Sequence, residues 1–381
     1  MHCLQPFAGS AIDFLSDLSD VLLNDTEARR FSDVAAFAFW CRRPHLSRLA
    51  RDYTSGPRRL GRGMTLHITP ANVPVTFAFS FVFGLLAGNP NIVRIPQSDF
   101  GQVNVICNAI DKLFAAPAYR LIASMNRLVQ YPHDDTITAF LGVRAAARII
   151  WGGDDSVARI RALPASARCV DITFADRYSL SLIQAEAVLD ATPASLQTLA
   201  RHFYNDAFSL QQNACSSPQL LLWMGDEDQT RQAQVRFWTA VQDVVEQQPP
   251  MAAAHAVDKL AILCHLAAHL PESSRFEPHG NDIYRVELPI LPGNMDRLRG
   301  RHGLFFEHRC ADLSPLQVIA GPRLQTVTCF GVAEADVADY VVAHGLSGVD
   351  RVVPVGTALT IGLIWDGYDL IASLTRIVGT A

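Results

Sequence analysis

Segments with helical periodicity alternate with short apolar strands over most of the chain. In the first sixty residues, apolar side chains such as Phe14, Leu18 and Leu22 recur at helical spacing, which predicts an N-terminal helical layer over residues 1–60. From residue 64 onward, short apolar runs are separated by turn residues. The pattern therefore predicts helices first and mixed helices and strands afterwards.

An apolar run over residues 73–87 lies between two predicted strands, at 64–69 and 91–95. The run carries no charged residue, starts beside prolines and ends in Gly-Asn-Pro. It therefore predicts a helix buried on all sides, although its phenylalanines alternate as they would in a strand. Two strands joined by such a helical crossover lie parallel in one sheet.

The strand–helix unit repeats up to about residue 195. Further strands are predicted over 127–131, 148–151 and 169–173, and helices over 102–115, over 135–141 and from Asp154 onward. Strands that alternate with helices predict a doubly wound, mostly parallel sheet. The fold class is therefore α/β, with a Rossmann-like domain over residues 61–195.

A second α/β domain is predicted over residues 196–355, and a C-terminal segment, 356–381, is expected to pack back on the core. The elements predicted from this region are helices over 193–206, 227–245 and 252–270 and strands over 219–223, 284–288 and 326–330.

Composition narrows the function classes. With 381 residues, 49% of them hydrophobic, the chain can bury a large core, and its net charge of −5 argues against nucleic acid as a partner. The eight cysteines are scattered without metal-ligand spacing, so no metal site is predicted. The 73–87 run is too short to span a bilayer, and the first residues do not open a secretory signal. We expect a cytoplasmic protein with free thiols.

Cys215 differs from the other cysteines in its surroundings. It lies in the polar, small-residue run Gln-Gln-Asn-Ala-Cys-Ser-Ser over 211–217, immediately before the predicted strand 219–223. Such a loop can expose a sulfur and direct backbone N–H groups at an oxyanion. The residues alone leave a catalytic thiol and an inert thiol equally open.

Two other segments carry residues suited to ligand binding. Asn72 follows the strand 64–69, where a neutral amide can donate to an oxyanion or cap the next helix. Gly152 and Gly153 follow the strand 148–151 and precede a helix, so they can admit a pyrophosphate or simply form a turn. Neither segment decides the function by itself.

Five segments follow one another in a specific order along the chain. They are LHITPANVPVTFAFSFVFGLLAGNPNIVRIPQSD (66–99), IIWGGDDSVARIR (149–161), ITFADRYSLSLI (172–183), QNACSSPQ (212–219) and WDGYDLIASLTRIV (365–378). Together they resemble the aldehyde dehydrogenase superfamily and, within it, the acyl-CoA reductases typified by the fatty-acid reductase of the bacterial bioluminescence operon. The resemblance runs from about Gly61 to the C-terminus. It implies a Rossmann-type cofactor domain and an α/β catalytic domain.

The resemblance also implies residue roles. Cys215 is the expected nucleophile, and the Asn72 amide and the Cys215 backbone N–H are the expected oxyanion donors. Arg94 is expected at the adenosine ribose or its phosphate. The other cofactor-binding residues that it implies are Pro70, Ser98, Gly152, Gly153 and Phe330, the last in a Phe-Gly pair beside the nicotinamide ribose.

Departures from the superfamily favour reduction with NADPH. Thr173 stands where oxidative members have the glutamate that activates water, so hydrolysis of an acyl-enzyme lacks its base. Gln97 and Ser98 stand where an acidic residue would repel a 2′-phosphate, and Arg94 would accept one. Thr328 replaces the glutamate before the Phe-Gly pair, so the nicotinamide ribose must be held differently.

Several marked residues have no assigned role. Asp176 and Arg177 are expected either to pair with each other or to position the acyl-enzyme loop, and Asp206 lies upstream of Cys215. Asp366, in Trp365-Asp366-Gly367, is expected either to cap a helix over 368–376 or to contact substrate. His67 is expected to be a hydrogen-bonded core histidine.

The sequence therefore predicts an NADPH-dependent reductase that converts an acyl thioester, of the fatty acyl type, to a long-chain aldehyde through an acyl-Cys215 intermediate. The donor is acyl-CoA or an acylated partner protein, as an acyl-protein synthetase would supply. Two alternatives remain open: an aldehyde dehydrogenase working oxidatively, and a non-catalytic acyl-transfer or binding subunit. By resemblance we expect a homo-oligomer.

Overall fold

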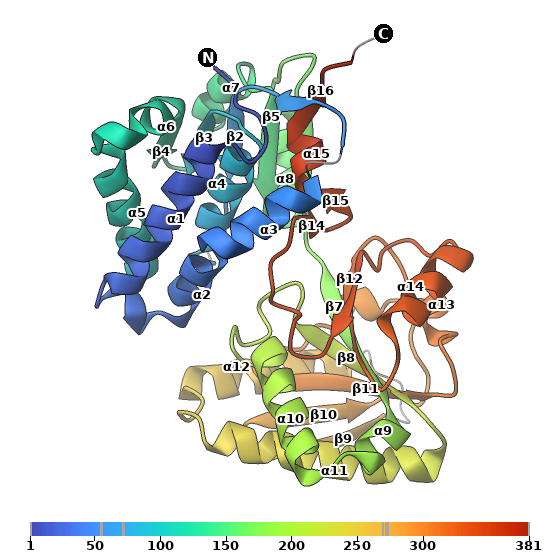
Figure 1. The fold of residues 1–381 in the computed structure, drawn as a ribbon. Coiled ribbons are helices and arrows are strands. Elements are labelled where there is room, and N and C mark those ends of the chain that lie inside the picture. Colours follow the sequence, from blue (N-terminus) through green and yellow to red (C-terminus); the bar gives the residue numbers. More distant parts are fainter. Residues whose placement is uncertain (1, 54–55, 71–72, 269, 271–273, 380–381) are drawn as a thin grey trace. The chain divides into compact units, whose positions relative to one another are not determined.

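The computed structural model describes residues 2–53, 56–70, 73–268, 270 and 274–379 (Figure 1). The chain forms two compact units: unit 1 comprises Met1–Ala175 and Tyr368–Ala381, and unit 2 comprises Asp176–Gly367. Each unit has its own sheet and helices, so the α/β class is confirmed. No helix in these ranges is long and apolar enough to cross a membrane.

Unit 1 contains a five-stranded sheet in which all neighbouring strands are parallel. Its strands, in spatial order, are β4 (Asn126–Val129), β3 (Asn91–Arg94), β2 (Thr65–Ile68), β5 (Ala147–Trp151) and β6 (Val170–Phe174). The predicted crossover is confirmed, because α4 (Thr76–Leu86) joins β2 to β3. Nine of the eleven residues of α4 are buried, as expected for a helix covered on all sides.

The N-terminal helices belong to unit 1. They are α1 (Gly9–Asn24), η1 (Ala28–Arg30), α2 (Ser32–Trp40) and α3 (Arg43–Tyr53). Phe14 of α1 packs edge-on against Phe81 of α4 and stacks on Phe114 of α5 (Gly101–Phe114), with ring centroids 6.3 and 5.5 Å apart. The helical layer expected over residues 1–60 therefore shares one core with the parallel sheet.

The remaining helices of unit 1 are η2 (Pro117–Tyr119), α6 (Arg120–Met125), α7 (Asp135–Gly142) and α8 (Asp154–Ala162). His67 of β2 is fully buried, with its ring nitrogens 2.8 Å from Ser80 Oγ and 2.9 Å from Asn91 Oδ1. Burial lowers the pKa of His67 to about 4, so the ring is neutral. The expectation of a satisfied core histidine is confirmed.

The helix predicted over 368–376 is confirmed only over Leu370–Leu374. The chain forms β15 (Tyr368–Asp369), α15 (Leu370–Leu374) and β16 (Thr375–Ile377). β16 pairs antiparallel with β1 (Arg59–Gly61), so a strand partner more than three hundred residues away interrupts the helical pattern. The cap of α15 is Asp369, whose Oδ1 accepts from Ala372 N at 2.8 Å.

Unit 2 contains a seven-stranded sheet, parallel except for one edge strand. Its strands, in spatial order, are β13 (Arg351–Pro354), β12 (Leu324–Phe330), β7 (Tyr178–Gln184), β8 (Pro218–Met224), β11 (Leu304–Cys310), β10 (Ile283–Glu287) and the antiparallel β9 (Arg275–His279). Its other elements are α9 (Ala185–Asp190), α10 (Pro193–Ala207), α11 (Glu227–Glu246), α12 (Ala253–Ala267), η3 (Met295–Arg297), α13 (Pro315–Ile319), α14 (Glu334–Ala343) and β14 (Ile364–Trp365).

Alternation along β8 explains why this sheet has a core on each face. Leu220 and Leu222 join one buried cluster, whereas Leu221 and Trp223 join the other.

The unit boundary lies between Ala175 and Asp176, ahead of the boundary expected near residue 195, because β7 pairs with β8 and β12. Likewise the segment expected to pack back over 356–381 is divided, and only residues from Tyr368 onward belong to unit 1.

Candidate active site

Cys215 lies in a turn between α10 and β8 that we call the nucleophile turn (residues 211–217), after its candidate nucleophile. Ser179 Oγ, at the start of β7, donates to the Cys215 carbonyl at 2.7 Å and accepts from Thr326 N at 3.1 Å. One buried hydroxyl thus joins the Cys215 main chain to two strands of the sheet.

The residues before Cys215 are anchored as well. Gln212 Nε2 donates to the Pro218 and Leu304 carbonyls at 3.2 and 3.1 Å, and Gln212 Oε1 accepts from Gly303 N at 2.8 Å. Gln211 and Gln212 both have left-handed backbones, with φ of 54° and 58°. Such strain persists only where surrounding contacts over-determine the backbone, and it is common at functional sites.

Burial raises the pKa of the half-buried Cys215 thiol, and the nearby groups oppose one another. A hydrogen bond from the Arg177 backbone lowers this pKa, the carboxylates of Asp366 and Asp176 raise it, and the Arg299 guanidinium lowers it. Because an ordinary thiol already titrates above neutrality, Cys215 is protonated at pH 7 in the free protein.

Asp176 and Arg177 form ion pairs with other described residues, so the first of the two expectations, an ion pair between them, is wrong, and the second stays a prediction. Arg177 Nη1 pairs with Asp350 and lies 3.6 Å from Asp366 Oδ1, whereas Asp176 Oδ2 lies 3.3 Å from Arg299 Nη2. Sequence reasoning missed Asp350 and Arg299, because both lie outside the five resembling segments.

The Trp365-Asp366-Gly367 segment contributes to the same cluster of charges. Asp366 has a left-handed backbone (φ 48°), and its buried carboxylate accepts a hydrogen bond from Gln325. The Arg351 guanidinium lies 4.4 Å from the centroid of the Trp365 ring. Asp366 does not cap the next helix, since Asp369 does.

Asp206, at the end of α10, ties the nucleophile turn to the loop after β13. Its Oδ2 accepts from Gly356 N at 2.6 Å and its Oδ1 from Ala358 N at 2.9 Å, while its carbonyl accepts from Ser217 Oγ at 2.7 Å. Burial raises the pKa of Asp206 to about 6, although the two N–H groups lower it. Gly356 has φ 99°, and a Cβ there would approach His202 Cγ to 2.6 Å, so this loop requires glycine.

The expected cofactor residues of unit 1 lie at the carboxyl edge of its sheet. Arg94 ends β3 opposite Ile68 of β2, and Trp151 ends β5 opposite Phe174 of β6. The strand order reverses between β2 and β5, because β3 and β4 continue on one side and β6 on the other. Parallel α/β sheets bind ligands at such a switch point.

Two of the expected segments flank this switch point. Pro70 follows β2, and Gly152 and Gly153 follow β5. Ser98 is exposed in the loop after β3. Asn72, the expected oxyanion donor, lies outside the described residues.

Arg94 suits an anionic ligand only in part. Its side chain is buried, Nε donates to the Tyr131 carbonyl at 3.2 Å, and the guanidinium lies 4.9 Å from the Tyr131 ring centroid. Its backbone carbonyl accepts from Thr69 Oγ1 at 2.6 Å, which fixes the end of β3 beside β2. Nη1 and Nη2 make no hydrogen bond to the residues that the structure describes, so they are the donors left for a phosphate.

The Gly-Gly turn also has mixed properties as a phosphate site. Gly153 is the N-cap of α8 without a side-chain cap, and no described atom lies within 4 Å of the position that a Cβ there would take. A ligand therefore has room beside the helix N-terminus. Asp154 and Asp155 occupy the first turn of α8, however, and their charges would repel an anion that approached from their side.

Phe330 lies away from Cys215. Leu324 begins β12 beside Arg177 and the nucleophile turn, because its carbonyl accepts from Arg177 Nη2. Phe330 ends the same strand, at the opposite edge of the sheet. At about 3.3 Å per residue, β12 separates Phe330 from Leu324 by roughly 20 Å. Thr328 is fully buried within the sheet, 2.6 Å from Ser181 Oγ. The structure therefore does not bring the expected Phe-Gly pair together with Cys215.

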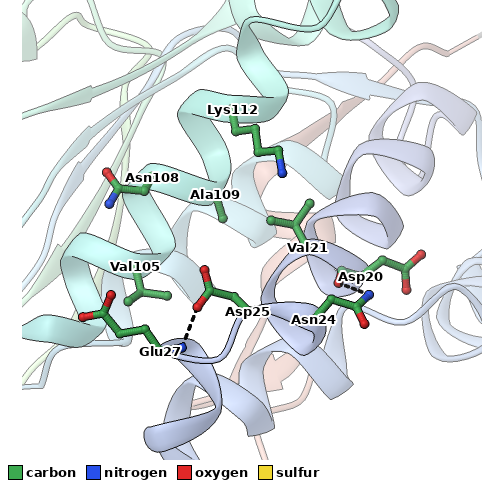
Figure 2. Close-up of a pocket in the computed structure, with 9 residues that line it drawn as sticks. All are labelled: Asp20, Val21, Asn24, Asp25, Glu27, Val105, Asn108, Ala109 and Lys112. Atoms are coloured by element: carbon green, nitrogen blue, oxygen red, sulfur yellow. Dashed lines mark hydrogen bonds between the residues drawn. The ribbon is translucent and has the colours of Figure 1, made fainter.

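A cavity of about 510 Å³ lies elsewhere in unit 1, between α1 and α5 (Figure 2). The Asp25 carboxylate already serves the fold, because its Oδ1 accepts from Glu27 N and Ala28 N, and Asn24 donates to the Asp20 carbonyl. None of the expected site residues lines it. Among the described residues, no group of His, Cys, Asp and Glu side chains could hold a metal ion.

Comparison with known proteins identifies similar families and folds. The family model described as acyl-CoA reductase (LuxC) matches residues 41–262. The chain is 26% identical over 168 residues to a long-chain acyl-protein thioester reductase of Aliivibrio fischeri, and 29% identical over 173 residues to one of Vibrio harveyi. These matches cover 43% and 45% of this chain but only 33% and 34% of the relatives, about a third of their length.

Solved structures with the same fold include aldehyde dehydrogenases. A mutant of the 1-pyrroline-5-carboxylate dehydrogenase of Thermus thermophilus has a TM-score of 0.64 at 12% identity, over 97% of this chain and 80% of that one. An NAD-dependent benzaldehyde dehydrogenase of Corynebacterium glutamicum has a TM-score of 0.64 at 12% identity, over 98% and 85%. The expected aldehyde dehydrogenase-like fold is confirmed.

Proposed function

The chain belongs to the LuxC family of acyl-CoA reductases, and from this premise we propose that it reduces a fatty acyl thioester to an aldehyde through an acyl-Cys215 intermediate. The observation that carries the proposal is the nucleophile turn. Cys215 lies in a turn whose flanks are anchored by Ser179 and Gln212 to three strands. Such anchoring holds a nucleophile in one geometry before substrate binds.

The chemistry divides into two transfers. The Cys215 thiolate attacks the thioester carbonyl, the Asn72 amide and a backbone N–H stabilise the oxyanion, and collapse expels the donor thiolate, which takes up a proton. NADPH, when bound, supplies a hydride. The acyl-Cys215 carbonyl carbon accepts that hydride, and collapse of the resulting thiohemiacetal releases the aldehyde and the Cys215 thiolate. One proton is consumed overall.

The proposed reductive direction rests on the lack of a general base at position 173 of β6. Thr173 is half-buried beside Ile150 at the carboxyl edge of the sheet, and a threonine cannot act as the base that activates water. An acyl-enzyme without such a base persists until hydride arrives. We expect aldehyde and NADP⁺ to give little free acid, which would be the main product of an oxidative enzyme.

The choice of NADPH rests on Arg94. Its free Nη groups at the end of β3 would pair with a 2′-phosphate, and Gln97 and Ser98 add no negative charge. Arg94→Ala should weaken NADPH binding about tenfold and NADH binding hardly at all, as measured by cofactor fluorescence. Equal weakening for both cofactors would remove the argument for the phosphate.

The acyl donor is proposed to be a thioester on a partner protein as well as on CoA. The two relatives named above are called acyl-protein thioester reductases, which favours a protein-borne acyl group. Comparing the rate of Cys215 acylation by acyl-CoA with that by an acylated protein thioester distinguishes the two donors.

The decisive experiment is intact-mass spectrometry after incubation with long-chain acyl-CoA or an acyl-protein thioester. We expect an acyl adduct on the wild type that NADPH discharges with release of aldehyde, and none on Cys215→Ala. Cys264→Ala is the matched control, because Cys264 is exposed on α12 and should keep the adduct. An adduct that persists on Cys215→Ala would refute the proposed nucleophile.

A further inference from the structure

The Arg177 peptide group stands next to the nucleophile. Arg177 lies just before β7, and its backbone forms a hydrogen bond with the Cys215 thiol. A backbone N–H is a donor that favours a thiolate over a thiol, because it is bonded more strongly by the charged form. What holds this peptide in place therefore influences the reactivity of Cys215.

The Arg177 side chain is fixed by partners on other strands and loops. Nη1 pairs with Asp350, Nη2 donates to the Leu324 carbonyl at 3.0 Å, and Asp366 Oδ1 lies 3.6 Å from Nη1. The guanidinium is nine-tenths buried, and its Nε has no hydrogen-bond partner among the described residues. Its position thus depends on the Nη contacts alone.

The main chain around Arg177 is fixed too. Arg299 Nη1 donates to the Arg177 carbonyl at 2.7 Å, and Tyr178 N donates to the Arg323 carbonyl at 2.8 Å. Arg299 also lies over the Tyr178 ring, 5.0 Å from its centroid. The peptide group between Arg177 and Tyr178 therefore cannot rotate without breaking a hydrogen bond.

We propose that Arg177 is a positioning residue whose clamp, formed by Asp350 and the Leu324 carbonyl, holds its backbone N–H on Cys215 Sγ so that the thiolate forms there. The clamp offsets the Asp366 and Asp176 carboxylates, which disfavour a thiolate, and it works beside Arg299, which favours one. This inference rests on the proposed role of Cys215 as nucleophile.

Substitution of Asp350 distinguishes the proposed clamp from an effect of nearby charges on the Cys215 thiol. The charges that act on Cys215 are those of Asp366, Asp176 and Arg299, and Asp350 is not among them. Asp350→Asn therefore loosens the Arg177 side chain without changing the charge that the thiol experiences directly. Asp176→Asn does the reverse, because it removes a nearby negative charge and leaves the contacts of Arg177 with Asp350 and Leu324 in place.

The experiment is the pH profile of Cys215 alkylation by iodoacetamide, quantified at that residue by peptide mapping, and it requires no turnover. We expect Asp350→Asn to shift the profile to higher pH, with about a tenfold lower alkylation rate at pH 7 and an unchanged rate at the alkaline plateau. Asp350→Glu should restore the wild-type profile, and Asp176→Asn should shift it to lower pH. Glu227→Gln, which breaks an exposed pair on α11, should leave it unchanged.

Superimposable profiles for Asp350→Asn and the wild type would overturn the clamp. A lower rate at the alkaline plateau as well would mean that the turn is disrupted, and would also count against it. If Asp350→Asn does not fold, Arg177→Lys replaces it, because lysine keeps the charge but cannot make both directed contacts. Failure of the proposed function would appear separately, as turnover by Cys215→Ala.

Discussion

Ser179→Ala removes the hydroxyl that links the nucleophile turn to the sheet. The pairing of β12 with β7 is irregular between Leu324 and Val327, and at this irregularity Ser179 Oγ accepts from Thr326 N. The substitution leaves that buried N–H without its partner, at about 1–3 kcal/mol, and removes the donor to the Cys215 carbonyl, at about 1 kcal/mol. We expect a loss of roughly 2–4 kcal/mol in the free energy of unfolding, measured by urea denaturation.

The same change should slow acylation. A turn released from β7 no longer holds Cys215 in one geometry, and a displacement of about 1 Å can slow a reaction up to roughly a hundredfold. Intact-mass kinetics with acyl-CoA should show a fall of roughly 10- to 100-fold relative to the wild type. Ser181→Ala is the matched control: Ser181 is equally buried on β7, but among the described residues its hydroxyl forms a hydrogen bond only with Thr328 Oγ1. Acylation at the wild-type rate by a destabilised Ser179→Ala would refute the reasoning.

Three further predictions concern stability. Burial raises the folded pKa of the Asp206 carboxyl to about 6, so the folded state binds its proton more tightly than the unfolded chain does. The free energy of unfolding should therefore fall by about 2 kcal/mol as pH rises from 4 to 6, and urea titrations of Asp206→Asn should lack this slope. Gly331→Ala should lower the free energy of unfolding by about 2–4 kcal/mol, measured by thermal unfolding, because its φ is 74° and a Cβ there would overlap that of Ala187. The control Gly280→Ala, with φ 59° and open space around it, should lower it by only about 1 kcal/mol. Glu307→Gln should lower the free energy of unfolding by about 3–5 kcal/mol, measured by chemical denaturation, because this buried carboxylate accepts from Trp223 and Trp238 and pairs with Arg285. A loss below about 1 kcal/mol would mean that the fold does not need the charge.

Local patterns were sufficient for the five strands of the first sheet and for β8, β10 and β12 of the second, whereas β7, β9, β11 and β13 were not predicted. The charge-free run over 73–87 and its flanking strands predicted β2, α4 and β3, because a helix between two short apolar strands has few other arrangements. The polar run 211–217 likewise predicted a turn before a strand, and Cys215 lies in that turn.

Contacts distant in sequence decided what the local patterns could not. The C-terminal helix predicted over 368–376 ends at Leu374, because β16 pairs with β1. An ion pair between Arg177 and Asp176 was one expectation. The partners of Arg177 are instead Asp350 and the Leu324 carbonyl, which come from segments that only the sheet of unit 2 brings to it. Phe330 matched a motif, but strand β12 carries it to the opposite edge from Cys215.

The sequence by itself determined the α/β class, the five strands of the first sheet and three strands of the second, because these depend on periodicity within short windows. The candidate nucleophile came from the family resemblance, since the residues around Cys215 alone left its role open. The tertiary structure alone decided which charged groups surround Cys215 and which hydrogen bonds hold its turn. Those contacts join β7, β12, α10 and the loop after β13, and their register is set by strand pairing rather than by any local pattern.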